Sequence, residues 1–290
     1  MSETNTGFSR PGTPEGAPRL AATVMLLRDR APGDLEVFMV KRSGKSAFMG
    51  GAYVFPGGKV DADDQVPEAV VASSVERALE RLPDRTLGLG LLVGAAREVF
   101  EEAGVLLGAG PGMDHTALAA ARAALNTKQR RFTELLPGPL DLSSLSPWAR
   151  WITPSKEPRR FDTYFFLARD PGQRASSDAY ETTDAAWLTP AEALAKHDAG
   201  QIMLPPPTLI NLIELSGLAS SSAALAAADA RSLAPILPKL GVDADRIAIF
   251  MPWAPEYADL EGEGTTMTRD HPCRGPLDRV ILDGERWIAR

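Results

Sequence analysis

The sequence is poor in cysteine and histidine. Its 290 residues include one cysteine, Cys273, and three histidines. A single thiol excludes an intramolecular disulfide and fits a reducing compartment. His115, His197 and His271 lie far apart, and only His271 is near Cys273, so no zinc-type cluster is predicted. The serines form no nucleophile-elbow pattern, and covalent hydrolase chemistry is therefore not predicted either.

The chain also lacks an excess of basic residues and a long apolar run. It has 38 Asp and Glu against 31 Lys and Arg, so a surface that holds nucleic acid by charge is not expected. The best apolar run, residues 20–27, is interrupted by Thr23 and falls short of the ~20 residues that span a membrane. Residues 1–18 are rich in Ser, Thr, Gly and Pro and predict a disordered lead rather than a signal peptide. We therefore expect a cytoplasmic protein with no nucleic acid or membrane partner.

Apolar runs separated by turn residues predict alternating strands and helices. Strands are expected at 21–27, 35–40, 52–55, 105–107, 148–152 and 161–168, the first two as a hairpin. Helices are expected at 67–81, 89–103, 116–130 and 190–197. After three prolines at 205–207 the pattern predicts helices at 208–215 and 219–233 and strands at 246–251 and 279–290. The alternation predicts an α/β fold.

The helix at 89–103 carries three carboxylates on one face. Glu98, Glu101 and Glu102 fall within an arc of about 100°, separate from an apolar stripe that includes Val99. Glutamates at this spacing repel one another by a few tenths of a kcal/mol per pair, and Arg97 can neutralise only part of that charge. Clustered oxygen donors suit Mg²⁺ or Mn²⁺. The alternative from this pattern alone is a solvated acidic face.

The wider pattern carries a resemblance to a family. GGAYVFPGGKVD followed by REVFEEAGVLL resembles the signature of the Nudix hydrolases, which cleave nucleoside diphosphates linked to another moiety. The resemblance covers about residues 19–204 and implies an α/β/α sandwich around a mixed sheet. It further implies that the metal, Mg²⁺ or Mn²⁺, is held by Glu98, Glu101, Glu102 and the backbone carbonyl of Gly57. Arg97 would orient a glutamate.

The match departs from the usual signature in two ways. The second glycine is normally 14 residues before the arginine, whereas Gly58 and Arg97 are 97 − 58 = 39 apart, which gives an insertion of 25 residues at about 61–88. The extra glutamate usually found eight residues before the arginine is replaced by Leu89. That change concerns the outer metal site. Residues 205–290 are expected to be an extension that packs on the Nudix domain, and the insertion or the extension would shape a lid or a homodimer contact.

A second block narrows the resemblance. WARWITPSKEPRRFDTYFFLA, residues 148–168, is similar to the peroxisomal coenzyme A diphosphatases of animals and their bacterial relatives. It implies cleavage of coenzyme A or an acyl-CoA into a phosphopantetheine product and adenosine 3′,5′-bisphosphate. Two alternatives stay open: a diphosphatase for ADP-ribose, another nucleoside diphosphate sugar or a dinucleotide, and a non-catalytic nucleotide-binding regulator. In each case the partner is a small-molecule nucleotide.

The chemistry requires a base and cations for the substrate phosphates. Glu98 is one candidate base, and Glu181 in the loop before 185–188 is another, preferred over Asp178. The predicted catalytic residues are Glu98, Glu101, Arg97 and Glu181. For phosphate binding the first choices are Arg159 and Arg160, followed by Lys41 and Arg42, because guanidinium groups bind phosphate bidentately. Phe48 and Tyr53 are predicted to stack on the base, whereas Phe55 is assigned to the core.

Overall fold

The central sheet is built on the hairpin of β1 (Arg19–Asp29) and β2 (Leu35–Arg42), which confirms the predicted hairpin. The computed structural model describes residues 16–31, 33–44, 50–67, 70–72, 75–108, 113–136, 138–178, 181–268, 271, 275 and 277–289. β6 (Phe161–Arg169) runs parallel to β1, and β5 (Ser146–Ile152) pairs antiparallel with β6. The other neighbours are β3 (Tyr53–Val54) and β7 (Thr182–Leu188) on β2, and β4 (Gly57–Lys59) on β1. One parallel pair among antiparallel pairs makes this seven-stranded sheet mixed.

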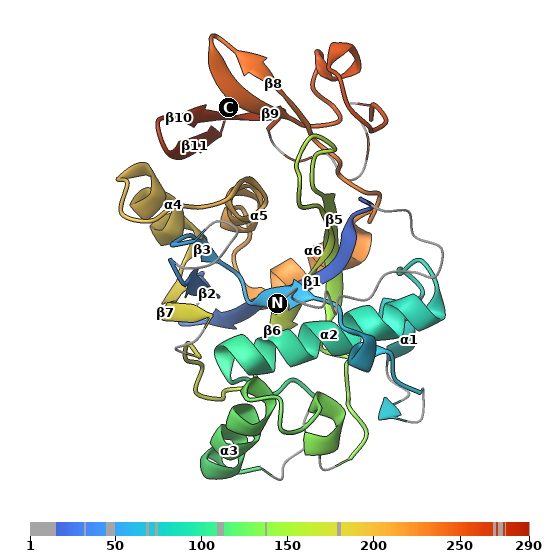
Figure 1. Ribbon diagram of the computed structural model, residues 1–290. Helices are drawn as coiled ribbons and strands as arrows, with labels where there is room; N and C mark the ends of the chain where they lie inside the picture. The colour runs from blue at the N-terminus through green and yellow to red at the C-terminus, as the bar shows by residue number, and fades with distance from the viewer. Residues whose placement is uncertain are drawn as a thin grey trace, which may run out of the picture.

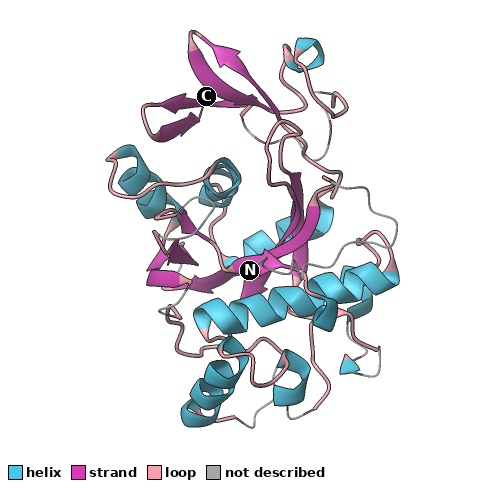
Figure 2. Cartoon of the chain, in the orientation of Figure 1, coloured by secondary structure: helices cyan, strands magenta, loops and turns pink. Residues whose placement is uncertain are grey.

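Helices cover both faces of the sheet (Figures 1 and 2). The side chains of β1 alternate, so Val24 and Leu26 lie in one buried cluster and Met25 and Leu27 in another. α2 (Arg85–Ala103) covers the first face, and α4 (Pro190–Asp198), α5 (Pro206–Ser216) and α6 (Ser221–Ala230) cover the second. α3 (His115–Asn126) packs against α2. The predicted α/β/α architecture around a mixed sheet is confirmed.

Helix α2 begins four residues earlier than predicted, at Arg85 rather than Leu89. The reason is Asp84, whose side chain caps the helix by accepting from the backbone N of Leu87 at 2.8 Å. The helix ends as predicted, because Gly104 takes the left-handed conformation at φ 71°. The last turn of α2 is therefore placed where the acidic motif lies.

Two glycines inside α2 let a neighbouring segment approach its backbone. A glycine in a helix interior costs roughly 1 kcal/mol relative to alanine, so its presence needs a packing reason. A Cβ added at Gly90 would lie 1.9 Å from Nε2 of Gln65, and one added at Gly94 would lie 3.0 Å from Oδ2 of Asp64. The segment 61–65 consequently lies directly against the helix, one turn before the acidic motif.

Two predicted elements differ from the structure. The helix expected at 67–81 is reduced, among its described residues, to α1 (Glu76–Leu79), while Val71 forms an isolated bridge with Leu140. The strand expected at 105–107 is absent from these described residues. The backbone N and O of Leu106 are bonded instead to the side-chain amide of Gln173, at 2.8 and 3.0 Å. The Gln173 side chain thus makes the hydrogen bonds that a neighbouring strand would make. The apolar residues 105–107 alone give no sign of this partner.

The C-terminal region adds a second sheet. β8 (Lys239–Asp243), β9 (Arg246–Phe250), β10 (Arg279–Asp283) and β11 (Arg286–Ala289) form an antiparallel sheet, and the stretch expected to be strand at 279–290 is divided into β10 and β11 by a turn at Gly284, where φ is 63°. Strand β8 was not predicted. Trp253 and Val280 from this region share a buried cluster with Leu209 of α5. The second sheet is thereby anchored to the helices that cover the far face of the central sheet.

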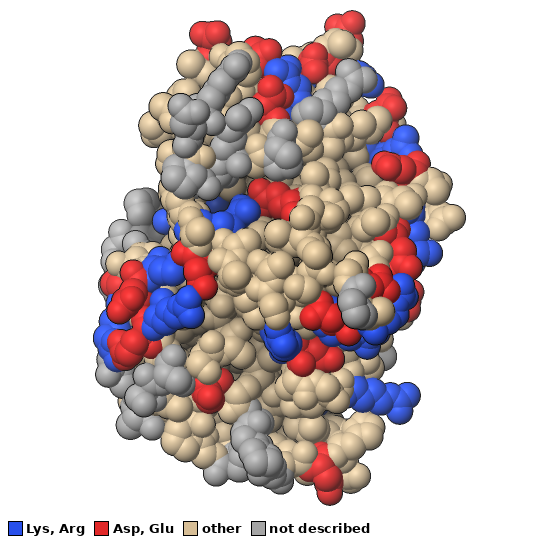
Figure 3. Space-filling model, turned by 180° about the vertical axis from the view of Figure 1, so that it is seen from behind, with Lys and Arg blue, Asp and Glu red and all other residues tan. Residues whose placement is uncertain are grey.

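The surface and the termini bear on the expected partners. Figure 3 shows acidic and basic side chains next to one another on the face it presents, without a broad basic area among the residues described. Within the described chain no single helix is long and apolar enough to cross a membrane; α5 and α6 meet the criterion only as a pair, which is bent by 110°. Most of the predicted N-terminal lead, residues 1–15, lies outside the described residues.

Candidate active site

Arg97 is the centre of a buried ion network on α2. Its side chain is 7% exposed and donates to both carboxylate oxygens of Asp64, at 2.8 and 2.9 Å. The same guanidinium donates to Glu98 at 2.9 Å, to Glu101 at 3.0 Å and to the backbone O of Lys59 at 2.8 Å. Burial alone would lower the pKa of Arg97, but the surrounding carboxylates raise it above its ordinary value. Arg97 thus fixes two of the three carboxylates of the acidic face.

Asp64 is a site residue that the sequence interpretation missed. The usual signature places its extra glutamate 14 − 8 = 6 residues after the second glycine, and six residues after Gly58 is Asp64. Counting backward from Arg97 across the insertion gave Leu89 instead, which is 4% exposed and packed in the core. The spacing from Gly58 was the available signal. Asp64 therefore takes the position of the extra acid of the signature, and the inserted residues lie between Asp64 and Arg97 in the sequence.

Gly57 and Gly58 at the start of β4, which we call the glycine turn, lie against the acidic helix. The backbone N of Gly57 donates to Glu102 at 3.0 Å. A Cβ added at Gly58 would lie 2.6 Å from Oε1 of Glu98, and one added at Gly57 would lie 2.6 Å from the backbone O of Ala22. At Gly57 the obstructing atoms belong mostly to the backbone of β1, so no side chain fits there; at Gly58 they belong to the Glu98 carboxylate, which would have to move. Gly57 is therefore required for the approach to β1, and Gly58 for the present position of the Glu98 carboxylate.

We expect Gly58→Ala to displace the Glu98 carboxylate and to lower kcat by about tenfold or more, the scale expected when a supporting group shifts a site residue. The fold should persist, because the obstructing atoms belong to the end of a side chain. Steady-state kinetics with circular dichroism as a folding check would measure this. The matched control is Gly44→Ala, since a Cβ there meets no described atom within 4 Å. Unchanged kinetics of Gly58→Ala would contradict the arrangement.

Burial raises the pKa values of all three carboxylates, and repulsion from neighbouring acids adds to the shift. Burial raises the pKa of Glu98 well above its ordinary value; Arg97 opposes the shift, while Glu101 and Glu102 add to it. Burial also raises the pKa of Glu101; Arg97 opposes the shift, while Asp64 and Glu181 add to it. Burial raises the pKa of Glu102 to about 8, although the Gly57 N–H and Arg42 act in the opposite direction. Negative charge is thus concentrated at one buried place, where a divalent cation would neutralise it.

The chemistry of these donors fits a divalent metal. Three carboxylates within one helical turn supply the hard oxygen ligands that Mg²⁺ and Mn²⁺ prefer. Among the described residues, no three acidic, histidine or cysteine side chains are arranged as a ready metal site. In this arrangement Glu98 and Glu101 accept from Arg97, while Glu102 accepts from Gly57. The three glutamates are thus suitable metal ligands, and in this structure their carboxylates accept these hydrogen bonds.

The structure brings Glu181 and Arg42 to the same place. Repulsion from Glu181 is among the causes that raise the pKa values of Glu101 and Glu102, and attraction to Arg42 lowers that of Glu102. The backbone O of Glu181 accepts from Ser43 at 2.8 Å, next to the end of β2. Two residues that are far from the acidic helix in sequence thus lie within electrostatic range of it.

The other predicted substrate contacts lie elsewhere or are engaged. Arg160 donates to the backbone O of Thr153 and to Glu263, so the C-terminal segment holds its guanidinium; Arg159 is exposed. The hydroxyl of Tyr53 donates to Asp184 at 2.6 Å, and burial together with this carboxylate raises the pKa of Tyr53 to about 12. Phe48 lies outside the described residues. A phosphate-binding role for Arg159 and Arg160 stays a prediction.

Comparison with known proteins identifies the family. Residues 73–215 match the model of the NUDT19 Nudix domain. Acyl-coenzyme A diphosphatase NUDT19 of Homo sapiens is 31% identical over 264 residues, covering 74% of this chain and 67% of that protein. The chain belongs to the Nudix hydrolase family. The protein of the same name from Xenopus laevis is 28% identical over 311 residues, covering 88% of this chain and 80% of that protein.

A solved Nudix structure agrees with this assignment. The Nudix hydrolase from Alicyclobacillus acidocaldarius superposes with a TM-score of 0.58 at 28% identity, covering 77% of this chain and all of that chain. The predicted Nudix fold and the prediction of a Nudix enzyme are confirmed. Nudix hydrolases generally use divalent metal ions, in accord with the oxygen donors on α2.

Proposed function

We propose that this Nudix enzyme hydrolyses the diphosphate of coenzyme A or an acyl-CoA with the help of Mg²⁺ or Mn²⁺. Water would attack one phosphorus, and the bridging P–O bond would break to give a phosphopantetheine product and adenosine 3′,5′-bisphosphate. Two relatives named acyl-coenzyme A diphosphatase match most of the chain, which supports the substrate class. No other substrate class has comparable support from the chain.

The single observation that carries the hydrolytic chemistry is the set of three glutamates ordered by Arg97 and the glycine turn. Diphosphate hydrolysis requires an activated water and neutralisation of charge on the phosphoryl oxygens. Glu98, Glu101 and Glu102 would hold the cation, with the carbonyl of Gly57 as a further ligand. A bound divalent cation supplies charge neutralisation and lowers the pKa of a coordinated water.

The remaining roles belong to side chains of the chain itself. Glu181, an exposed acid within electrostatic range of Glu101 and Glu102, is the proposed base that accepts the proton of the attacking water. Arg97 keeps Glu98 and Glu101 in place and does not itself react. Arg42 provides a positive charge at the edge of the acidic set, suited to a substrate phosphate.

The proposed division of the chain follows the sequence prediction with one refinement. Residues 19–204 would form the catalytic unit and 205–290 an extension packed against it. This is supported by the shared buried cluster of Leu209, Trp253 and Val280 with strands of the central sheet. The position of Asp64 supports an insertion that starts after residue 64 rather than at about 61.

The test is a substrate panel with product analysis. CoA, acyl-CoA, ADP-ribose, NADH and a diadenosine polyphosphate would be incubated with Mg²⁺, with Mn²⁺ or with a chelator. We expect the highest kcat/KM for CoA or acyl-CoA, adenosine 3′,5′-bisphosphate as a product, and no turnover with the chelator. A preference for ADP-ribose would refute the substrate assignment. Tight nucleotide binding without product at any metal concentration would refute the enzymatic role.

A further inference from the structure

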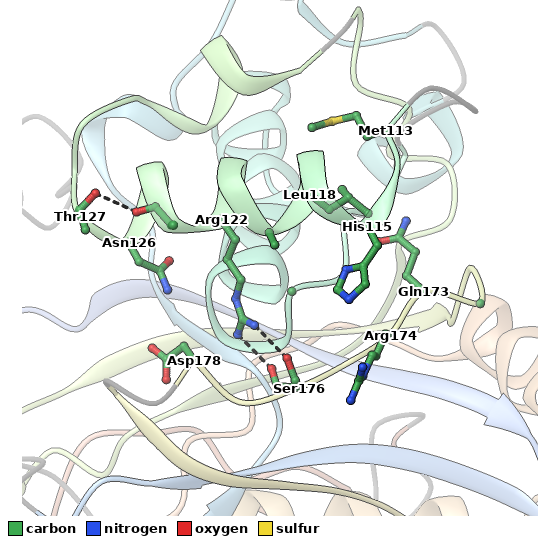
Figure 4. Close-up of a pocket in the computed structure, with 14 residues that line it drawn as sticks. Met113, His115, Leu118, Arg122, Asn126, Thr127, Gln173, Arg174, Ser176 and Asp178 are labelled. Carbon is green, nitrogen blue, oxygen red and sulfur yellow. Dashed lines mark hydrogen bonds between the residues drawn. The ribbon is translucent and has the colours of Figure 1, made fainter.

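Arg122 of α3 joins the last turn of the acidic helix to the loop that follows β6. Its Nε donates to the backbone O of Glu101 at 2.9 Å. Its Nη2 donates to the backbone O of Ser176 at 2.9 Å, and its Nη1 to the Ser176 hydroxyl at 3.1 Å. Figure 4 shows this side chain reaching from the helix to Ser176. One guanidinium therefore satisfies a carbonyl on each of two segments.

The helix end is shaped to receive this guanidinium. A Cβ added at Gly104 would lie 2.8 Å from Nη1 of Arg122. Gly104 also needs its left-handed conformation, with φ at 71°. The backbone N of Ser176 donates to the O of Ala103 at 2.9 Å, which fixes the loop to the same helix end. Ala103, Gly104, Arg122 and Ser176 thus form one hydrogen-bonded junction between the end of α2, α3 and the segment after β6.

Asp178, two residues after Ser176, is hydrogen-bonded to Glu181 and Thr182. The carboxylate of Asp178 accepts from the backbone N of Glu181 at 3.1 Å and from the backbone N of Thr182 at 2.8 Å. It also accepts from the Thr182 hydroxyl at 2.7 Å. Because Asp178 follows Ser176 by two residues, displacement of Ser176 would be passed directly to the backbone of Glu181.

We propose that Arg122 is a positioning residue that sets the distance between Glu181 and the carboxylates of α2. It connects the backbone carbonyl of Glu101 to Ser176, and Asp178, two residues later, is bonded to the backbone of Glu181. The inference rests on the proposed function insofar as Glu181 is the base. Its structural part, that Arg122 orders the Glu181 loop, is independent of any activity.

A groove beside Arg122 makes a direct test feasible. It has a volume of about 540 Å³ and is lined by residues of α3 and of the 172–178 loop, among them Leu118, Arg122 and Arg174. Truncating Arg122 to alanine leaves a guanidinium-sized space that opens to this groove. A small guanidinium compound can therefore reach the vacated position.

The experiment compares Arg122→Ala with Arg122→Lys and with Arg131→Ala, a control in which an exposed arginine near α3 loses its contact with Glu134. We expect Arg122→Ala to lower kcat by about tenfold or more with little change in KM, as for other groups that orient site residues. Arg122→Lys should fall between alanine and wild type. Methylguanidinium at millimolar concentration should restore kcat of the alanine variant alone, in a saturable manner.

Two further measurements separate positioning from general destabilisation. In a Glu181→Gln background, Arg122→Ala should lower kcat no further, because the two residues act through one group. Amide exchange at Glu181 and Thr182 should accelerate in Arg122→Ala while exchange in the central strands stays unchanged. Additive losses of kcat or unaltered exchange would overturn the proposal. Should the wild type hydrolyse no substrate of the panel, the proposed function fails, and the exchange result alone decides the role of Arg122.

Discussion

Glu102→Gln is expected to lower kcat/KM for the best substrate of the panel by about 10²–10³-fold, the scale measured when a charge-stabilising group is removed from a site. Glutamine has the shape of glutamate and can still accept from Gly57, so the turn should stay in place. What disappears is one negative charge among three. We therefore expect the variant to bind Mg²⁺ or Mn²⁺ more weakly while it stays folded.

The same change should stabilise the metal-free protein at pH 8. The folded-state pKa of Glu102 is about 8, compared with an ordinary value of 4.5. Between these values the folded state binds more protons than the unfolded state, so the free energy of unfolding falls as pH rises from about 4.5 to 8. Glu98 and Glu101, whose pKa values are also raised, act in the same direction. In Glu102→Gln, which lacks this ionisable group, the free energy of unfolding should fall less between about pH 4.5 and 8.

Metal should reverse the decline in the wild type. A cation that binds only the folded state adds stability according to its concentration, and it needs the carboxylates deprotonated, so its effect grows with pH. We expect thermal melts without metal to show Tm falling by several degrees between pH 5 and about pH 8.5, and Mg²⁺ to remove most of that fall. Glu102→Gln should show a smaller fall and a smaller response to metal.

The matched control for both measurements is Glu80→Gln, an exposed glutamate next to α1. It should leave kcat/KM, the pH dependence of Tm and the response to metal as in wild type. Wild-type activity in Glu102→Gln would remove this carboxylate from the metal site. An unchanged pH slope would show that Glu102 is not protonated in the folded metal-free protein.

The local part of the site could be predicted from the sequence because it lies within single elements. Glu98, Glu101 and Glu102 share a face by helical periodicity, and Gly104 ends the helix because only glycine adopts its conformation at no cost. The strands of the central sheet follow from short β-branched runs between turn residues. These signals depend on neighbours within about four residues, which a sequence displays directly.

The part that could not be predicted depends on contacts between distant segments. Strand β4 contains both glycines of the Pro-Gly-Gly run, a sequence typical of a turn, and it pairs with β1 because Gly57 has no side chain to collide with the backbone of Ala22. The apolar residues 105–107 are no strand because Gln173, more than 60 residues away, takes up the hydrogen-bonding groups of Leu106. Likewise the pairing of the Arg160 guanidinium with Glu263 joins residues that are 103 positions apart. Each outcome is fixed by a partner with no sequence proximity.

Asp64→Asn is expected to be the most damaging single change outside the acidic face. Asp64 is 1% exposed and holds Arg97 through two hydrogen bonds. An asparagine keeps one acceptor, but its amide nitrogen would face an N–H of the guanidinium. Removing one partner of a buried pair destabilises by about 3–5 kcal/mol, and we expect about 3 because Glu98 and Glu101 still compensate the charge. Urea unfolding measures this loss.

Asp64→Asn should also lower activity. Without both bonds to Asp64, the Arg97 guanidinium is no longer held in one orientation, and it in turn holds Glu98 and Glu101. Groups that orient metal-binding side chains typically contribute about 10–100-fold, and kcat/KM of Asp64→Asn should fall by that factor at temperatures where it is folded. The control is Asp63→Asn, an exposed carboxylate in the same turn, expected to have a free energy of unfolding within about 0.5 kcal/mol of wild type.

A double variant tests which position holds the acid of the signature. Adding Leu89→Glu to Asp64→Asn places an acid at the position counted back from Arg97, but residue 89 is in the core, so the double variant should be less stable than Asp64→Asn. Recovery of activity in the double variant would instead show that position 89, not Asp64, is where the signature acid acts.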